Sequence, residues 1–108
     1  MKRRGIVNSL LRIEKVRGEA PRPFERPNGD MNFWVLELPT RHDSPRQWTL
    51  QVGRVLRKHS KLLRELRRKH ALLTLFIETA GGPTHLRLEV NFLKLLSELE
   101  IALEHFDS

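Results

Sequence analysis

Residues 54–70 read RVLRKHSKLLRELRRKH, and this stretch decides how the fold is built. It carries eight lysines and arginines against a single acid, Glu65. On a helix that turns by about 100° per residue, the apolar side chains of this stretch and its approach fall within an arc of about 120°. They are Val52, Val55, Leu56, Leu62, Leu63 and Leu66. The basic residues fall mostly on the other side, so the pattern predicts a helix with one buried face and one strongly positive face.

The residues ahead of this stretch predict where the helix begins. Ser44 suits the N-cap, Pro45 suits the first helical position, and Gln47 stands where the partner of a capping box belongs. Trp48 falls in the same arc as the apolar residues that follow it, so we expect it to pack inward. Gly53 costs about 1 kcal/mol relative to alanine inside a helix, which predicts irregular first turns.

Two apolar stretches predict strands. Residues 31–38 read MNFWVLEL and residues 72–79 read LLTLFIET, and both are rich in the β-branched and aromatic residues that strands favour. Apolar side chains occur on both faces of each stretch. We therefore expect residues 31–38 to form an inner strand or one covered by helices, and residues 72–79 to form a strand buried on both faces. Residues 85–89 alternate between apolar and polar, which fits a short strand or an extended segment.

The ends of the chain give weaker patterns. Ile6, Leu10 and Ile13 are spaced as on a short amphipathic helix over 6–13. Residues 18–30 hold three prolines and two glycines, which predicts a loop or an extended edge. Residues 80–83 form a turn, and residues 90–99 have the spacing of a helix. Residues 100–106 fit either a strand or a continuation of that helix.

These elements predict a single α+β domain over residues 1–108. We expect two layers, with a sheet of three or four strands covered mainly on one face by helices. The composition, 39% apolar and 31% charged, suits a folded domain. The chain has no cysteine, which excludes disulfides and thiolate metal sites and fits a reducing compartment. No stretch approaches the roughly 18 apolar residues of a membrane span, so we expect a cytoplasmic protein without membrane contact.

The order of elements resembles a small bacterial family catalogued as domain of unknown function 4279. Residues 9–14 resemble that family's first helix end, and residues 17–19 resemble its basic-glycine-acidic turn. Trp34 with Leu36 resembles its Trp-bearing strand, and residues 63–66 resemble its long central helix. The apolar residues from Leu93 to Leu103 resemble its closing helix and strand. The resemblance implies a strand as the last element and implies no activity or catalytic residue.

The sequence contains no recognisable catalytic or metal-binding pattern. The five histidines lack metal-ligand spacing, and the serines and threonines lie in no nucleophile motif. Gly81 and Gly82 lack the lysine and hydroxyl residue of a phosphate-binding loop. We therefore expect no enzyme activity, no metal and no cofactor.

Charge leaves two functional readings open. The net charge is +7 and the isoelectric point about 10.8, values that occur in nucleic-acid-binding proteins. The chain lacks tyrosine, and Trp34, Trp48, Phe33, Phe76 and Phe92 all have a place in the expected core. We therefore expect a small binding or interaction module that contacts an unknown protein partner or self-associates. The alternative is a nucleic-acid-binding module whose phosphate contacts come from the basic helix at Arg57, Lys61, Arg64 and Arg68.

Overall fold

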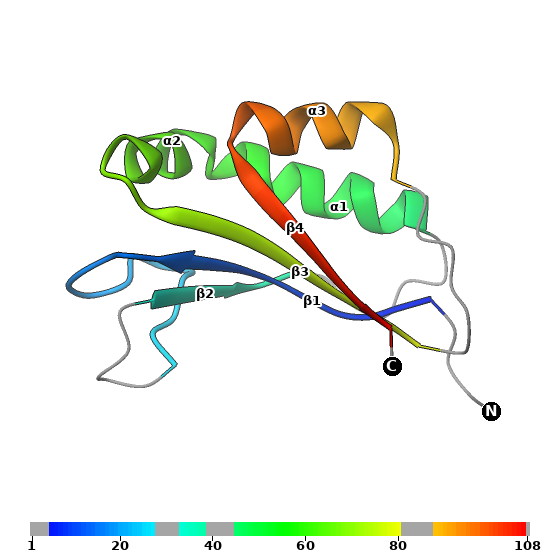
Figure 1. The fold of residues 1–108 in the computed structure, drawn as a ribbon, viewed down its shortest axis with the longest axis horizontal. Helices are drawn as coiled ribbons and strands as arrows, with labels where there is room; N and C mark the ends of the chain where they lie inside the picture. Colours follow the sequence, from blue (N-terminus) through cyan, green and yellow to red (C-terminus); the bar gives the residue numbers. More distant parts are fainter. Residues whose placement is uncertain (1–4, 28–32, 39–44, 81–87, 108) are drawn as a thin grey trace.

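Four strands form one mixed sheet, and the helices of the described chain cover one of its faces (Figure 1). The computed structural model describes residues 5–27, 33–38, 45–80 and 88–107. The elements are β1 (Gly5–Glu14), β2 (Phe33–Glu37), α1 (Pro45–Lys58), α2 (Ser60–Arg68), β3 (Leu72–Ala80), α3 (Val90–Glu98) and β4 (Ile101–Asp107). This arrangement confirms the two-layer α+β fold.

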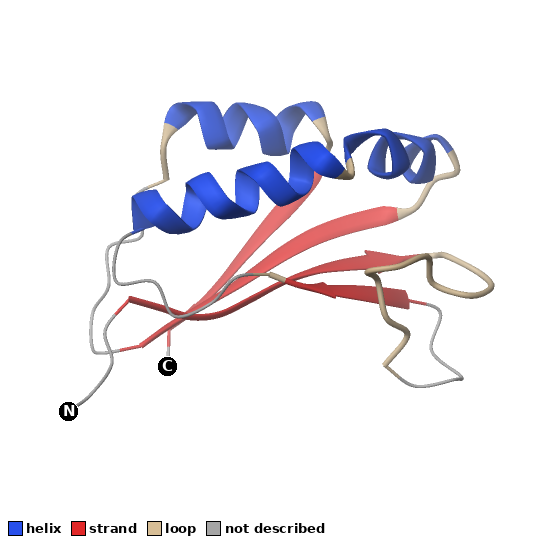
Figure 2. Cartoon of the chain, turned by 180° about the vertical axis from the view of Figure 1, so that it is seen from behind, coloured by secondary structure: helices blue, strands red, loops and turns tan. Residues whose placement is uncertain are grey.

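The sheet has the strand order β2-β1-β3-β4. Strand β1 runs antiparallel to both of its neighbours, whereas β3 and β4 are parallel and are joined through α3. Figure 2 shows the three helices together on one side of the strands. The opposite side of the sheet therefore carries no helix of the described chain.

The helix expected over residues 6–13 is wrong, because this segment is strand β1. Leu11 and Ile13 are buried under the helices, while Arg12 between them points to the other face. The register shifts between Ile6 and Asn8, which brings Ile6 and Ser9 to the same buried face. A bulge of this kind inserts one extra residue into a strand, so the spacing of buried residues becomes three at that point. That local spacing imitates a helix.

Two further expectations about burial are corrected. Strand β2 is an edge strand and not an inner one, with Trp34 and Leu36 in the core. Strand β3 is central but is not buried on both faces, since Leu72 is 40% exposed. Both strands also carry apolar side chains on the second face, which no helix of the described chain covers.

The end of the chain forms strand β4, which the family resemblance implied. Helix α3 ends at Glu98, and Glu100 adopts a left-handed conformation (φ 54°) that turns the chain into the sheet. A single residue with positive φ is a common way to end a helix. The ambiguity over residues 100–106 is therefore resolved in favour of a strand.

The long basic helix is divided in two. Helix α1 is regular through Gly53, contrary to the irregular first turns that we expected, and the break falls at His59 instead. A Cβ atom on Gly53 would lie 3.3 Å from Arg57 Nη1 and 4.0 Å from Leu95 Cδ2, so the glycine lies against α3. The predicted cap at Ser44 and the segments 80–83 and 85–89 lie wholly or mostly outside the described residues.

The predicted apolar arc forms the helix side of the core. Trp48, Val52, Leu56, Leu63 and Leu66 are buried, and Val55 and Leu62 pack partly buried against them. Their partners on the sheet include buried residues of β1 and β3. They are Leu11, Ile13, Leu73, Leu75 and Ile77. The phase predicted for the helix is thus confirmed.

His59, at the break between α1 and α2, makes the stability of the fold depend on pH. Its ring lies edge-on against Phe24 at 5.7 Å between ring centroids. Burial, and secondly the charge of Lys58, lower the pKa of His59 below its usual value of 6.5. The unfolded chain therefore takes up this proton at a higher pH than the folded chain, so acidification favours unfolding.

We expect the free energy of unfolding contributed by His59 to be complete above about pH 7 and to decrease as the pH falls through 6.5 toward the folded pKa. Urea unfolding of the wild type and of His59→Gln at several pH values measures the difference. The other titrating groups are common to both proteins. The difference should change in favour of the variant on acidification, and parallel pH profiles would contradict the assignment.

Candidate binding surface

The face of the sheet opposite the helices is formed by alternate residues of all four strands. We call it the open face. Strand β1 contributes Asn8, Leu10, Arg12 and Glu14, and β2 contributes Phe33, Val35 and Glu37. Strand β3 contributes Leu72, Thr74, Phe76 and Glu78, and β4 contributes Ala102, Glu104 and Phe106. These side chains are partly or fully exposed.

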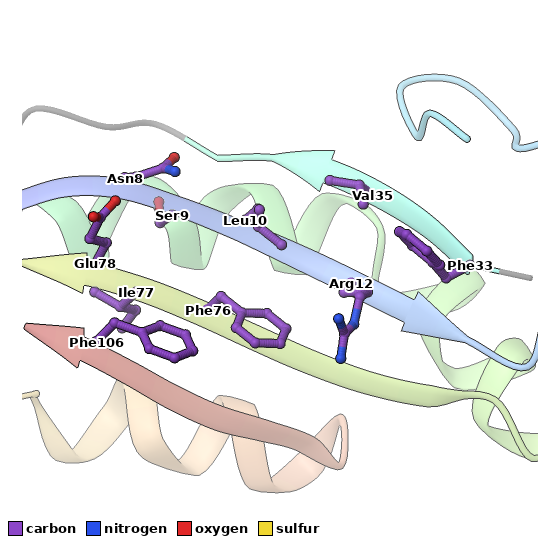
Figure 3. Close-up of a pocket in the computed structure, with 10 residues that line it drawn as sticks. All are labelled: Asn8, Ser9, Leu10, Arg12, Phe33, Val35, Phe76, Ile77, Glu78 and Phe106. Atoms are coloured by element: carbon purple, nitrogen blue, oxygen red, sulfur yellow. The ribbon is translucent and has the colours of Figure 1, made fainter. Parts of the chain in front are cut away.

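One side chain from each strand forms a diagonal row across the open face, the aromatic ladder (Figure 3). The guanidinium carbon of Arg12 lies 5.9 Å from the ring centroid of Phe33 and 4.7 Å from that of Phe76. Phe76 in turn stacks on Phe106, with ring centroids 5.9 Å apart and planes at 3°. The ladder therefore runs from β2 through β1 and β3 to β4 without interruption.

Arg12 is fixed between Phe33 and Phe76, toward the β2 end of this ladder. Its Nη2 atom lies 2.7 Å from Oε1 of Glu14, and its side chain is 37% exposed. The Nε atom is buried and has no hydrogen-bond partner among the described residues. A guanidinium held between aromatic rings keeps a planar, weakly hydrated charge in place. Arg12 is therefore oriented by stacking and by one ion pair, which leaves little charge for a ligand.

The ladder lines an open hollow of about 500 Å³. Its other lining residues are Asn8, Ser9, Leu10, Val35, Ile77 and Glu78 (Figure 3). Pockets for small ligands occupy about 300–1,000 Å³, so the hollow can receive a side chain or a short segment of a partner. Phe106 at its rim is 52% exposed. Such an exposure of a large ring is typical of a contact surface.

The open face is acidic although the whole chain is basic. Among the described residues it carries Glu14, Glu37, Glu78 and Glu104 against one cation, Arg12. Arg12 pairs with Glu14, and the other three carboxylates have no ion-pair partner among the residues that the structure describes. Single-stranded nucleic acids stack on exposed aromatic rings, but their binding also needs cations for the phosphates. The open face is negatively charged, so it would repel the phosphates of a nucleic acid.

Sequence reasoning missed this surface because it assigned Phe33 and Phe76 to the core. Both rings lie on the open face, whereas Trp34, Trp48 and Phe92 are buried. The alternation of side chains along each strand could have indicated this surface. Phe33 lies on the opposite face from Trp34, and Phe76 lies on the opposite face from Leu75. Recognising the two rings as exposed required knowing that no helix of the described chain covers that face of the sheet.

The predicted basic residues lie on the helix layer. Arg57 is on α1, and Lys61, Arg64 and Arg68 are on α2, all four exposed. The break at His59 divides them between two helices. A hollow of about 290 Å³ brings Arg64 and Arg68 together with Glu98 and Glu100, so acids partly offset these cations.

Arg67, between these cations, has a structural role. Its Nε atom lies 2.8 Å from Oε2 of Glu100, and its Nη1 donates to the carbonyl oxygen of Ala71 at 2.8 Å. These contacts join the end of α2 to the start of β3 and to the turn before β4. We therefore do not count Arg67 among the cations available to a ligand.

Thr79, His105 and Asp107 form the one group of described residues that invites comparison with a catalytic triad. The hydroxyl of Thr79 donates to Oδ1 of Asp107 at 2.9 Å and lies 2.8 Å from Nε2 of His105. Thr79 is fully buried, however, so a substrate has no access to its oxygen. A nucleophile must reach its substrate, and this cluster instead fastens the end of β4 to β3.

The described residues contain no group of three or more histidine, aspartate or glutamate side chains arranged to hold a metal ion. Among the same residues, no helix is both long and apolar enough to cross a membrane. Comparisons of the chain with protein-family models, with curated proteins and with solved structures give no match.

Proposed function

We propose that this protein is a small non-enzymatic interaction module that binds a protein partner through the open face. The observation that carries the proposal is the aromatic ladder, an exposed and ordered array of three phenylalanines and one arginine across four strands. A few residues carry most of the binding energy at protein interfaces, and aromatic and arginine side chains are enriched among them. The contacts within the ladder already order these side chains, so binding costs little of their conformational entropy.

Charge narrows the class of partner. Two copies of the chain joined through their open faces would bring three uncompensated carboxylates of one against three of the other, and like charges in contact are unfavourable. A nucleic acid would meet the same repulsion through its phosphates. A protein surface with an apolar centre surrounded by basic residues fits the open face. Its centre would pack on the ladder, and its basic residues would pair with the carboxylates.

The proposal includes no catalytic residue, metal or cofactor. It also places the protein in the cytoplasm, supported by the absence of cysteine from the chain. The residues expected to make the contact are those of the ladder together with Glu78 and Glu104 beside it.

A matched pair of surface variants tests the proposal. The open-face variant is Phe33→Ser with Phe106→Ser, and the helix-face variant is Arg57→Gln, Lys61→Gln, Arg64→Gln and Arg68→Gln. A partner captured from nuclease-treated host extract is identified, purified and titrated with each protein. We expect the open-face variant to lose affinity at least about 30-fold, as for an interface hot spot, and the helix-face variant to retain it.

Thermal unfolding of both variants checks that the fold is intact. The result that contradicts the proposal is a partner that binds the open-face variant as well as it binds the wild type.

Nucleic-acid binding by the helix layer is the second candidate function. The supporting observation is that Arg57, Lys61, Arg64 and Arg68 are all exposed on α1 and α2. If they contact phosphates, the logarithm of affinity should fall with the logarithm of salt by about 0.7–0.9 per contact.

We expect weak, unsaturated binding when the wild type is titrated with single-stranded RNA and with duplex DNA at two salt concentrations. The helix-face variant should differ little, because glutamine is also a good helix former and the fold is preserved. Tight binding at physiological salt that disappears in the helix-face variant would favour the second function.

A further inference from the structure

Both ends of the aromatic ladder combine phenylalanine rings with carboxylates. They differ in that a cation of the described residues, Arg12, lies at only one of them. Near β1, the guanidinium of Arg12 lies between Phe33 and Phe76 and pairs with the carboxylate of Glu14 at 2.7 Å. This end combines rings, a carboxylate and a cation. It shows how the open face of this chain accommodates an arginine side chain.

At the other end, rings and carboxylates are present, and no cation of the described residues pairs with them. Phe106 stacks on Phe76 and is 52% exposed. Glu78 is the register partner of Phe106, and Glu104 is the register partner of Phe76, so each glutamate stands beside one of the stacked rings in the sheet. Neither carboxylate has an ion-pair partner among the described residues.

The hollow leads to this end of the ladder. Figure 3 shows Glu78 and Phe106 at one end of the hollow and Phe33 at the other, with Arg12 between. Glu78, Phe76 and Phe106 all line it. A side chain that enters the hollow can therefore contact the rings of Phe76 and Phe106 and the carboxylate of Glu78.

We propose that Phe106, Glu78 and Glu104 form the docking position for an arginine side chain of the protein partner. A guanidinium is planar, so it can stack on the exposed ring as Arg12 does on Phe76. Its paired N–H groups match a carboxylate, and two carboxylates here compensate its charge. This inference rests on the proposed function and names the chemistry that the partner brings to the open face.

A small arginine probe tests the position directly. The isotope-labelled full chain is titrated with N-acetyl-L-arginine amide, and the backbone amide resonances are followed by NMR. We expect saturable shifts, with millimolar affinity, at Glu78, Glu104 and Phe106. The neutral isostere N-acetyl-L-citrulline amide should produce no saturable shift there, because it lacks the charge.

Three exposed or partly exposed positions supply the variants. Removing one carboxylate, by Glu78→Gln or Glu104→Gln, should weaken binding of the arginine amide by up to about fivefold, the range of an exposed ion pair. Phe106→Leu should weaken it through loss of the ring. The matched control is Glu37→Gln, which removes an exposed carboxylate of the same face at the β2 edge. It should leave the affinity unchanged.

Equal shifts with the citrulline amide would overturn the inference, as would shifts centred on Glu37 or an affinity insensitive to Glu78→Gln and Glu104→Gln. Absence of any saturable shift would also overturn the inference. If the arginine probe fails while the open-face variant still loses the purified partner, the arginine position is wrong and the binding surface stands. If both fail, the proposed function fails as well.

Discussion

Replacing Trp48 by alanine is expected to lower the free energy of unfolding by about 3–5 kcal/mol. Trp48 is fully buried where α1, α3 and β1 meet. Its ring packs edge-on against Phe92 at 5.4 Å, and its indole nitrogen donates to Oγ of Ser9 at 3.0 Å. The substitution removes the largest fully buried side chain and leaves a cavity between both layers.

Trp48→Phe separates the two contributions of this residue. Phenylalanine retains most of the apolar contact but cannot donate to Ser9, so we expect a smaller loss, about 1–3 kcal/mol. Urea unfolding followed by far-ultraviolet circular dichroism measures both variants. Equal losses for the two substitutions would mean that the hydrogen bond, and not the volume of the ring, dominates.

The helix layer could be predicted from sequence because its signal is local. Val52, Leu56, Leu63 and Leu66 recur with the period of a helix, and a helix places such residues on one face whatever the rest of the chain does. Trp48 followed from the same arc. Its hydrogen bond to Ser9 could not be predicted, since it joins residues 39 positions apart.

The first strand was missed for a physical reason. A bulge between Ile6 and Asn8 changes the alternation of β1 from two to three, and three is close to the helical period. Beyond the bulge, Leu11, Arg12 and Ile13 alternate as a strand should. The sequence contains both patterns, and only pairing with β2 and β3 decides between them.

The candidate site could not be predicted from the sequence, because its residues come from four strands. The contact of Arg12 with Phe76 depends on the antiparallel register of β1 and β3, and the stacking of Phe76 on Phe106 depends on the parallel register of β3 and β4. Strand registers are set by the whole sheet and leave no local trace. The sequence alone therefore placed Phe33 and Phe76 in the core and gave Phe106 no part in a site.

The fold separates charge as well as burial. Cations are exposed on α1 and α2, whereas the open face has four carboxylates and one arginine. A basic partner, as we propose, would be attracted to the open face and repelled by the helix layer, so this charge pattern would orient it before contact.

Leu63→Ala is expected to lower the free energy of unfolding by about 2–5 kcal/mol. Leu63 is fully buried in α2, a helix of 9 residues that follows the break at His59. Helices shorter than about 12 residues are unstable in isolation, so α2 is held by the burial of Leu63 and Leu66 against the sheet. Removing three carbon atoms from the first leaves a cavity beneath a short helix.

The measurement is a thermal midpoint, which should fall by more than about 8 °C for a domain of this size. Leu72→Ala is the matched control, because the same atoms are removed from a residue that is 40% exposed, and it should cost less than about 1 kcal/mol. The open face lies on the other side of the sheet, so the remaining folded Leu63→Ala protein should still bind the arginine amide at low temperature. An unchanged midpoint would mean that α2 does not depend on its apolar face, and the packing described for the helix layer would be wrong.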